Sequence, residues 1–235
     1  MLSDKNKSTA EKFWLAELGV QSFPPGIHVQ SHDPSALWDL ADRAVFFQHA
    51  NGVFITLTPK DLLDLRDAFK SSTAAPVDIF ISGMASKGTI VGNGPAYVGY
   101  LDCLQGAESL ICLVDRVDSR VQTIAKQYPN DWDVFGLADQ SRGPFAVIED
   151  GRILGLSHYE IWGGVIAHIG VVTVPSARGR GVGELVVRQA AQDALRNGLL
   201  PQYRTLWANT PSIRIAEKMG FCHFATTVVV RCGER

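Results

Sequence analysis

The chain has 235 residues and a mass of 25.6 kDa, enough for one large domain or two small ones. Its 22 Lys and Arg residues stand against 24 Asp and Glu residues, so the formal charge of −2 gives no basic field typical of a nucleic-acid-binding protein. With 46% hydrophobic and 20% charged residues, the composition is that of a globular protein and excludes a wholly disordered chain.

The cysteine spacing and the hydropathy pattern indicate the cellular compartment in which the protein is expected. The 4 cysteines show no C-x-x-C pair or other zinc-type spacing, so we expect small core residues in a reducing environment, with no metal site. Residues 1–12 are polar and do not resemble a secretory signal. The most apolar stretch, 161–175, is too short to span a bilayer. We therefore expect a cytoplasmic protein with no membrane partner.

The first hundred residues predict a mixed α and β region. In chain order we expect a helix at 34–43 with Asp33 as N-cap, a hairpin of strands 45–49 and 53–57 around Asn51-Gly52, a helix opened by Thr58 and Pro59, and a strand at 77–81. The second of these helices is expected to bury Leu62, Leu63, Leu65 and Phe69. Residues 83–106 are rich in glycine and support no clear assignment. Within them, Gly92-Asn93-Gly94 is interpreted as a plain loop rather than a phosphate-binding turn, because no third glycine has the required spacing and Pro95 intrudes.

From about residue 109 the pattern is more regular. We expect a strand at 110–114, a helix at 119–128, a hairpin of strands 145–149 and 153–161 around Asp150-Gly151, a strand at 166–174, a helix at 182–197, a strand at 203–208 and a helix at 211–219. His158, Tyr159 and Glu160 are interpreted as polar residues of an edge strand. The chain therefore divides into an N-terminal α/β region of unclear role, 1–105, and a second domain, 106–235.

The most informative segment joins the strand ending at Val174 to the long helix that follows. It reads Arg178-Gly179-Arg180-Gly181-Val182-Gly183. Glycines let the backbone approach a ligand, and the N–H groups and dipole at a helix start favour an anion. Two arginines suit a diphosphate better than a carboxylate. Taken alone, the motif also fits a surface loop with two solvated arginines.

The order and spacing of further residues resemble the GNAT superfamily of acyl-CoA-dependent N-acyltransferases. The resemblance rests on Val172-x-Val174, Arg178-x-x-Gly181-x-Gly183, Asn209-x-x-Ser212 and Ala216-x-Lys218-x-Gly220-Phe221. It covers residues 109–235. It implies an α/β (α+β) fold with a GNAT-like mixed, mostly antiparallel, twisted sheet flanked by helices, next to the smaller N-terminal α/β region.

The resemblance also implies acetyl-CoA as co-substrate, bound where the strands at 166–174 and 203–208 splay apart. The residues that it places against the pantetheine arm are Val172, Thr173 and Val174, with the main-chain groups of Val172 and Val174 pairing with the arm. The diphosphate would lie beside Arg178, on the amides of Gly179, Arg180, Gly181, Val182 and Gly183. Asn209 would donate to the pantetheine end, and Ser212 would lie close to the cofactor.

His168 is the candidate catalytic residue. Many family members have an acidic residue six positions before the equivalent of Val174, and His168 occupies that position. Strand alternation puts its side chain on the face of Val172 and Val174, and an imidazole suits a general base at neutral pH. A core histidine bonded to a carbonyl is the alternative. The tyrosine that often serves as general acid, seven residues after Asn209, is replaced by Ala216.

The sequence therefore predicts an N-acetyltransferase that moves the acetyl group of acetyl-CoA to a primary amine by direct attack, without a covalent enzyme intermediate. A non-catalytic GNAT-like module that senses acyl-CoA is the alternative, which the missing tyrosine favours slightly. A loop serving another nucleotide is a third. The acceptor amine stays open, no nucleic-acid partner is expected, and a homodimer is expected only from base rates.

Overall fold

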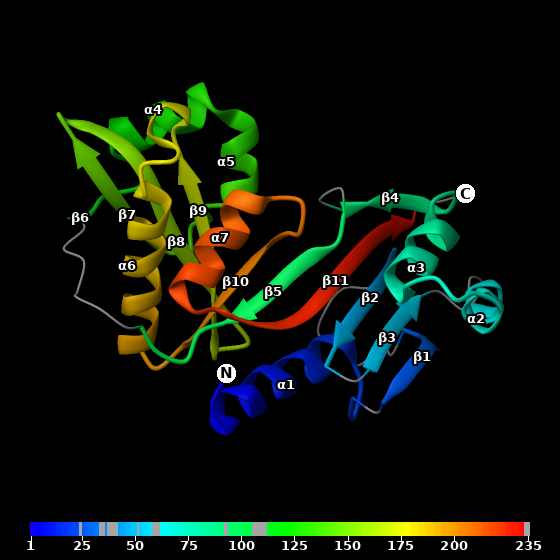
Figure 1. Ribbon diagram of the computed structural model, residues 1–235. Helices are drawn as coiled ribbons and strands as arrows, with labels where there is room; N and C mark the ends of the chain where they lie inside the picture. The colour runs from blue at the N-terminus through cyan, green and yellow to red at the C-terminus, as the bar shows by residue number, and fades with distance from the viewer. Residues whose placement is uncertain are drawn as a thin grey trace. The chain divides into compact units, whose positions relative to one another are not determined.

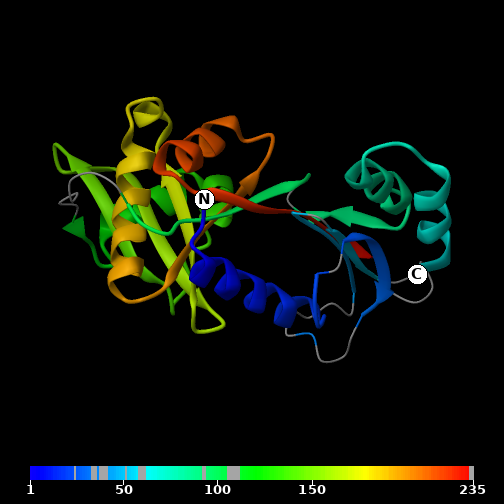
Figure 2. The same ribbon diagram turned by 60° about the horizontal axis from the view of Figure 1, so that its bottom comes forward.

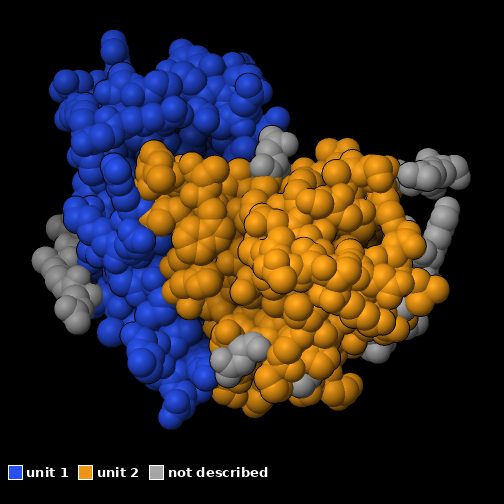
Figure 3. Space-filling model, turned by 45° about the vertical axis from the view of Figure 1, so that its right-hand side comes forward, with its two compact units in different colours: residues 1–7, 99–204, 214–222 blue, residues 8–98, 205–213, 223–235 orange. Residues whose placement is uncertain are grey.

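The computed structural model describes residues 1–23, 25–32, 36, 42–50, 52–57, 62–91, 94–104 and 112–232. The chain divides into two compact units, coloured separately in Figure 3: residues 1–7, 99–204 and 214–222 form the first, and residues 8–98, 205–213 and 223–235 the second. The division falls within α1 (Asp4–Leu18), β5 (Ala96–Tyr100), β10 (Leu200–Leu206), α7 (Thr210–Met219) and β11 (Cys222–Cys232). The boundary expected after residue 105 lies outside the described residues, so the division into 1–105 and 106–235 stays a prediction.

The first unit is built on a mixed sheet with the strand order β10-β9-β8-β7-β6 (Figure 1). Its further strands are β6 (Cys112–Leu113), β7 (Arg142–Glu149), β8 (Arg152–Trp162) and β9 (Ile166–Thr173). All neighbouring pairs are antiparallel except β9 and β10, which run parallel. Together with its helices, this sheet confirms the fold class expected from the sequence.

Helices cover both faces of this sheet. They are α4 (Ser119–Gln127), α5 (Pro129–Phe135) and α6 (Val182–Arg196), and a short 3₁₀ turn, η3 (Pro175–Ala177), precedes α6. α6 runs along one face, as Figure 1 and Figure 2 show, and the Tyr159 hydroxyl of β8 donates to Asp193 of α6 at 2.7 Å. On the opposite face, Nε2–H of His158 donates to the Phe135 carbonyl of α5 at 2.6 Å.

β8 is thus an interior strand, paired with β7 on one edge and with β9 on the other. His158 and Tyr159 are 2% and 1% exposed, and they point to opposite faces. The interpretation of His158, Tyr159 and Glu160 as edge-strand residues is therefore wrong. The polar side chains occur in the interior because His158 and Tyr159 each find a hydrogen-bond partner there.

Two local predictions for this unit are confirmed. Asp150 and Gly151 have φ of 49° and 74°, the positive values that a tight hairpin turn between β7 and β8 requires. The expected apolar stripe of α6 is buried, with Val186, Val187 and Ala190 fully covered. These signals are local, so the sequence alone suffices to find them.

The second unit contains a sheet with the order β1-β3-β2-β11, and β4 also pairs with β11. Its elements are β1 (Gly26–Ser31), β2 (Arg43–His49), β3 (Gly52–Leu57), α2 (Leu62–Ser71), α3 (Pro76–Met84) and β4 (Gly88–Ile90). A core forms between the strands and the two helices and includes Phe46, Ile55, Leu65, Phe80 and Val228. Trp14 of α1 packs on Phe47 of β2, with ring centroids 4.8 Å apart.

The predictions for this region meet mixed outcomes. The hairpin of β2 and β3 is confirmed, with Gly52 paired to His49 and so inside the strand. Leu65 is buried, whereas Leu63 is 69% exposed. Most of the helix expected at 34–43 lies outside the described residues, as do its expected N-cap Asp33 and Asn51, Thr58 and Pro59, and its last residue, Arg43, starts β2 instead.

One expectation in this region is wrong. Residues 77–81 form part of α3 rather than a strand, because Pro76 starts the helix and Ile79, Phe80 and Met84 share its buried face. Residues 83–106, which had no clear assignment, contain β4 and β5, and β4 pairs with a distant part of the chain. Gly92 and Asn93, in the turn interpreted as a plain loop, lie outside the described residues.

The cysteines and the membrane question can be compared with the structure directly. Cys103 and Cys112 are exposed, Cys222 and Cys232 are half-buried, and all four are free thiols. The expectation that they are core residues is therefore wrong. Among the described helices, none combines the length and the apolar character needed to cross a bilayer.

Candidate functional site

The two parallel strands of the first unit part after a short paired segment. β9 and β10 pair from Ile166 and Leu200 to Ile169 and Tyr203. β9 then continues through residues 170–173, where its pairing with β8 goes on. One edge of β9 is thus left without a strand partner from residue 170 onwards, in the described part of the chain.

The register of β8 and β9 identifies the main-chain groups at that open edge. The N–H of Val174 donates to the Leu154 carbonyl of the β8 segment at 3.0 Å. Backbone groups of successive residues alternate between the two edges of a strand, so Val172 also faces β8 while Val171 and Thr173 face the open edge. The sequence analysis assigned these groups to Val172 and Val174. That assignment is wrong by one residue, because the pairing with β8 determines which alternate residues of β9 face the open edge.

The loop before α6 presents unpaired amides. Gly179 and Gly181 have φ of 76° and 80°, values that glycine adopts without strain. Among the described residues, no carbonyl accepts from the N–H groups of Gly179, Gly181, Val182 or Gly183. Arg180 differs, since its N–H donates to the Ala177 carbonyl at 3.4 Å. Four of the five amides expected to receive a diphosphate are therefore available.

The surroundings of these amides fit an anion. No atom lies within 4 Å of the position where a Cβ would be built on Gly179 or Gly181, so the loop is open on that side. Gly181 is the N-cap residue of α6, a helix of 15 residues whose dipole adds positive potential at this end. The loop and the open edge of β9 are joined directly by η3, within one unit.

The arginine side chains of the loop are already paired. Arg178 donates through Nη2 to Asp131 of α5 at 2.7 Å and through Nε to the Thr173 carbonyl at 3.3 Å. Arg180 donates to both carboxylate oxygens of Glu149 at 2.8 and 2.9 Å. Because all four side chains are about half exposed, these ion pairs are weak, and an incoming phosphate would exchange with the carboxylates.

His168 lies in the paired half of β9 and is held on two sides. Its Nδ1 is 2.9 Å from Oε1 of Gln202, the directly paired residue on β10. Its ring stacks on Trp162 with centroids 3.9 Å apart and an interplanar angle of 15°. Trp162 is held in turn, since its indole N–H donates to Glu160 at 3.1 Å. The alternative of a core histidine bonded to a backbone carbonyl does not describe these contacts.

The imidazole of His168 is neutral over the whole physiological range. Burial and the nearby Arg204 guanidinium lower its pKa to about 3, against a smaller opposite effect of the Gln202 hydrogen bond. The ring nonetheless keeps accessible surface, because Nε2 makes no bond to a described residue and is not among the buried unpaired atoms. His168 is therefore a permanent hydrogen-bond acceptor rather than a strong base.

Asn209 and Ser212 belong to the second unit, whereas residues 168–183 belong to the first. Within the second unit, the Ser212 N–H donates to Oδ1 of Asn209 at 3.3 Å, at the start of α7. Asn209 therefore caps this helix. Ala216, at the position of the family's tyrosine, is fully buried and has no proton to donate.

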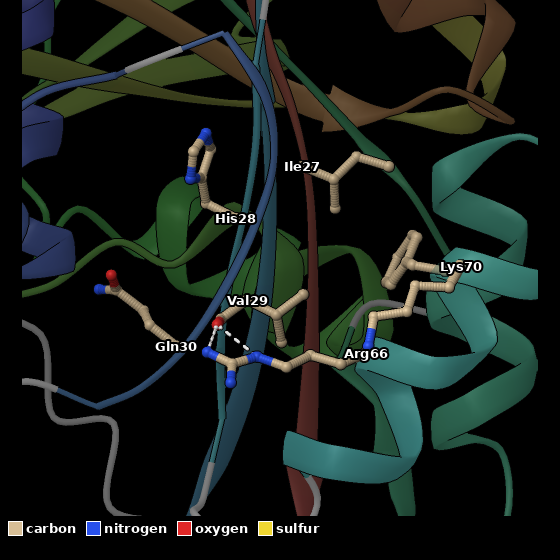
Figure 4. Close-up of a pocket in the computed structure, with 7 residues that line it drawn as sticks. Ile27, His28, Val29, Gln30, Arg66 and Lys70 are labelled. Atoms are coloured by element: carbon tan, nitrogen blue, oxygen red, sulfur yellow. Dashed lines mark hydrogen bonds between the residues drawn. The ribbon is translucent and has the colours of Figure 1, made fainter.

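A groove of about 550 Å³ lies in the second unit between β1 and α2 (Figure 4). Arg66 belongs to its lining and donates from Nε and Nη2 to the Val29 carbonyl at 3.2 and 2.7 Å. That contact covers a carbonyl of the last strand of the sheet, where another strand could otherwise add. None of the residues expected to function from the sequence lines this groove. In the described part of the chain, no group of three or more His, Cys, Asp or Glu side chains could hold a metal ion.

Several residues of this site were missed in the sequence. Val171 could have been found from the Gly163-Gly164 turn, which sets the β8–β9 register. No local sequence pattern marks Gln202 or Tyr100. Gln202 lies 34 residues from its partner His168 along the chain, and Tyr100 lies 102 residues from its partner Gln202.

The family comparison adds an independent finding. The family model described as acetyltransferase (GNAT) family matches residues 112–221. A comparison with curated protein sequences gave no match.

Solved structures resemble the chain at a low level. A GNAT-family protein from Novosphingobium aromaticivorans has 18% identity over 62% of this chain and 67% of its own, with a TM-score of 0.49. A GNAT-family acetyltransferase from Colwellia psychrerythraea has 14% identity over 76% of each chain, with a TM-score of 0.49. The yncA protein from Salmonella typhimurium, solved with acetyl-CoA, has 16% identity over 55% of this chain and 96% of its own, with a TM-score of 0.38. The similarity of residues 112–221 to the GNAT family therefore rests on the sequence match.

Proposed function

We propose that the protein is an N-acetyltransferase that transfers the acetyl group of acetyl-CoA to a primary amine, because residues 112–221 match the acetyltransferase (GNAT) family model. One observation carries the proposal beyond the family match. Four unpaired amides at the start of α6 continue directly from an open strand edge, so the main chain alone offers a track of donors for a long, anionic ligand.

The expected binding groups follow from that track. The amides of Gly179, Gly181, Val182 and Gly183 would hold the diphosphate, with Arg178 and Arg180 joining after exchange of their carboxylate partners. Val171 and Thr173 would pair with the pantetheine arm as a neighbouring strand does. The resemblance alone implies a cofactor contact for Asn209 and Ser212.

Acetyl-CoA supplies the acetyl group as a thioester: the amine nitrogen bonds to the carbonyl carbon, the C–S bond breaks, the amine loses a proton and the thiol leaves with one. Negative charge grows on the carbonyl oxygen meanwhile. The Val171 N–H faces the open edge of β9 and would donate to that oxygen.

His168 would act on the amine. Because its pKa of about 3 is far below that of an alkylamine, it cannot deprotonate a free ammonium group. It can accept a hydrogen bond from the neutral amine and orient its lone pair. It can also share the proton once the N–C bond forms, since the nitrogen is then strongly acidic.

The alternative function is an acyl-CoA sensor without transfer activity. The absence of a tyrosine at Ala216 favours it, because no side chain at that position can protonate the leaving thiolate. A thiolate is a tolerable leaving group near neutral pH, so this absence does not prevent catalysis. The proposed function also includes a cytoplasmic location and an amine as the acceptor of the acetyl group.

The test is an acceptor panel read out by thiol release. Purified protein is mixed with acetyl-CoA and amino acids, aminoglycosides, polyamines, amino sugars or peptides with free N-termini. We expect at least one class to raise thiol release tenfold or more over the amine-free rate, and His168→Ala to lower kcat/KM tenfold with unchanged acetyl-CoA binding. Tight CoA binding without release on any class would establish the sensor.

A further inference from the structure

We propose that Gln202 and Tyr100 are positioning residues that hold His168 in a single tautomer, with the proton on Nδ1 and the lone pair on Nε2 left to accept a hydrogen bond from the amine. The role in catalysis rests on the proposed function. The tautomer itself can be observed without any substrate.

The contacts form a continuous buried chain. Gln202 and Tyr100 are both 0% exposed. Nε2 of Gln202 donates to the Tyr100 hydroxyl at 2.6 Å, and Oε1 lies 2.9 Å from Nδ1 of His168. Since the amide nitrogen is used by Tyr100, only the amide oxygen faces the imidazole. An oxygen can only accept, so Nδ1 must carry the proton.

The neutral state of the ring makes this constraint decisive. A neutral imidazole has one donor and one acceptor nitrogen, so a proton on Nδ1 leaves the lone pair on Nε2. Trp162 fixes the plane of the ring by stacking. Nε2 keeps its access to solvent, as described above.

His158 on β8 provides the contrast. Its Nε2 donates to Phe135, so its lone pair is on Nδ1, but that atom is buried and unpaired. Two histidines on one face of the sheet therefore have opposite tautomers, and only His168 offers its acceptor to a ligand. In each histidine, the hydrogen bond donated by one ring nitrogen determines which nitrogen remains as the acceptor.

The charged groups around His168 act in the same direction. Arg204 on β10 and His158 on β8 both oppose a positive charge on the ring. Glu160 lies opposite on β8, where the Trp162 indole N–H engages its carboxylate. Tyr100 on β5 reaches His168 only through Gln202. The polar contact of the ring itself is thus a neutral amide, which orients imidazole without making it basic.

The direct test is nitrogen NMR of histidine side chains in the ligand-free protein. We expect His168 to show the Nδ1-protonated tautomer alone, and Gln202→Leu or Tyr100→Phe to release it to the Nε2-protonated form that free imidazole prefers. The matched control is Gln192→Leu, because Gln192 is another buried glutamine, on α6, and its Oε1 has no partner. An Nε2-protonated His168 in the unmodified protein overturns the proposal.

Kinetics then separate positioning from mere stability. We expect Gln202→Leu to lower kcat at least tenfold while the KM for acetyl-CoA changes less than twofold. Gln202→Glu places a carboxylate beside Nδ1, so the acid limb of the kcat profile should move upward by one pH unit or more. An unmoved profile in Gln202→Glu, with folding intact by circular dichroism, contradicts the proposal. The expected tautomer without acetylation of any amine refutes the proposed function alone.

Discussion

The two halves of β9 differ in what they offer. From Ile166 to Ile169 the strand is paired on both edges, and the group proposed to act there is a side chain, His168, held by neighbours on β8 and β10. Beyond Ile169, β10 departs, and the strand offers its own backbone instead. A fully paired strand positions side chains rigidly, whereas a strand with one open edge can bind a ligand through main-chain groups. Under the proposed function, one strand would thus contact both substrates of a transfer reaction.

The largest effect should come from the open half and its loop. Gly181→Asp places a negative charge and a Cβ at φ of 80°, among the amides that would hold a diphosphate. We expect CoA affinity to fall at least 100-fold in calorimetry. Gly198→Asp is the control, because Gly198 has φ of 72° and open space at the other end of α6. Equal loss of affinity in both variants would contradict the assigned role of the loop.

The next effect concerns packing where the strand halves meet. A Cβ on Gly170 would lie 2.4 Å from Nε2 of His158 and 2.6 Å from the Phe135 carbonyl. Gly170→Ala should therefore break their hydrogen bond and lower the free energy of unfolding by about 2 kcal/mol in urea titrations. Gly155→Ala meets a movable Cγ of Val182 at 2.6 Å and should lose less. A larger loss of unfolding free energy in Gly155→Ala than in Gly170→Ala would show that Gly170 is not tightly enclosed.

The paired half predicts a pH dependence of stability. Burial and Arg204 lower the pKa of His168 to about 3, so the folded protein stays neutral there while the unfolded chain binds a proton below about pH 6.5. The stability present above pH 6.5 is therefore lost progressively as the pH falls toward 3. His168→Gln should lose less stability between pH 7.5 and 5 than the unmodified protein, by about 2 kcal/mol. Identical losses in both proteins would contradict the neutral imidazole.

The smallest effect concerns the carboxylates that occupy the loop arginines. Glu149→Gln frees Arg180, and we expect CoA affinity to rise two- to fivefold at low salt, with a steeper salt dependence. Asp139→Asn removes the same charge from a pair with Arg116 and should leave affinity unchanged. Weaker binding by Glu149→Gln would show that Glu149 supports the loop rather than competing with the ligand.

The features of this site that depend on local sequence could be predicted, whereas those that depend on strand pairing could not. The loop could be predicted because glycines at 179 and 181, arginines and the apolar stripe of α6 are local signals. The choice of Val172 and Val174 over Val171 and Thr173 failed because strand alternation gives two sets of residues, and only the pairing with β8 selects one. The family resemblance indicated which strand would pair with the ligand, but not which of its two sets of alternate residues faces the open edge.

The surroundings of His168 were beyond prediction for a similar reason. Its position was found from the spacing to Val174, but Gln202, Tyr100 and Trp162 reach it only through the folded sheet. They change its expected chemistry, because burial removes the basicity for which a histidine was first considered. In the second unit, α3 was mistaken for a strand since β-branched residues at 77–81 outweighed the start signal of Pro76.

The most direct measurement follows the backbone amides of isotope-labelled protein by NMR as CoA is added. The account predicts that the signals of Gly179, Gly181, Val182 and Gly183 shift together with those of Val171 and Thr173, while Gly198 stays in place. If CoA saturates the protein without moving the loop amides, or does not bind at millimolar concentration, the main chain around β9 and α6 is not its binding site.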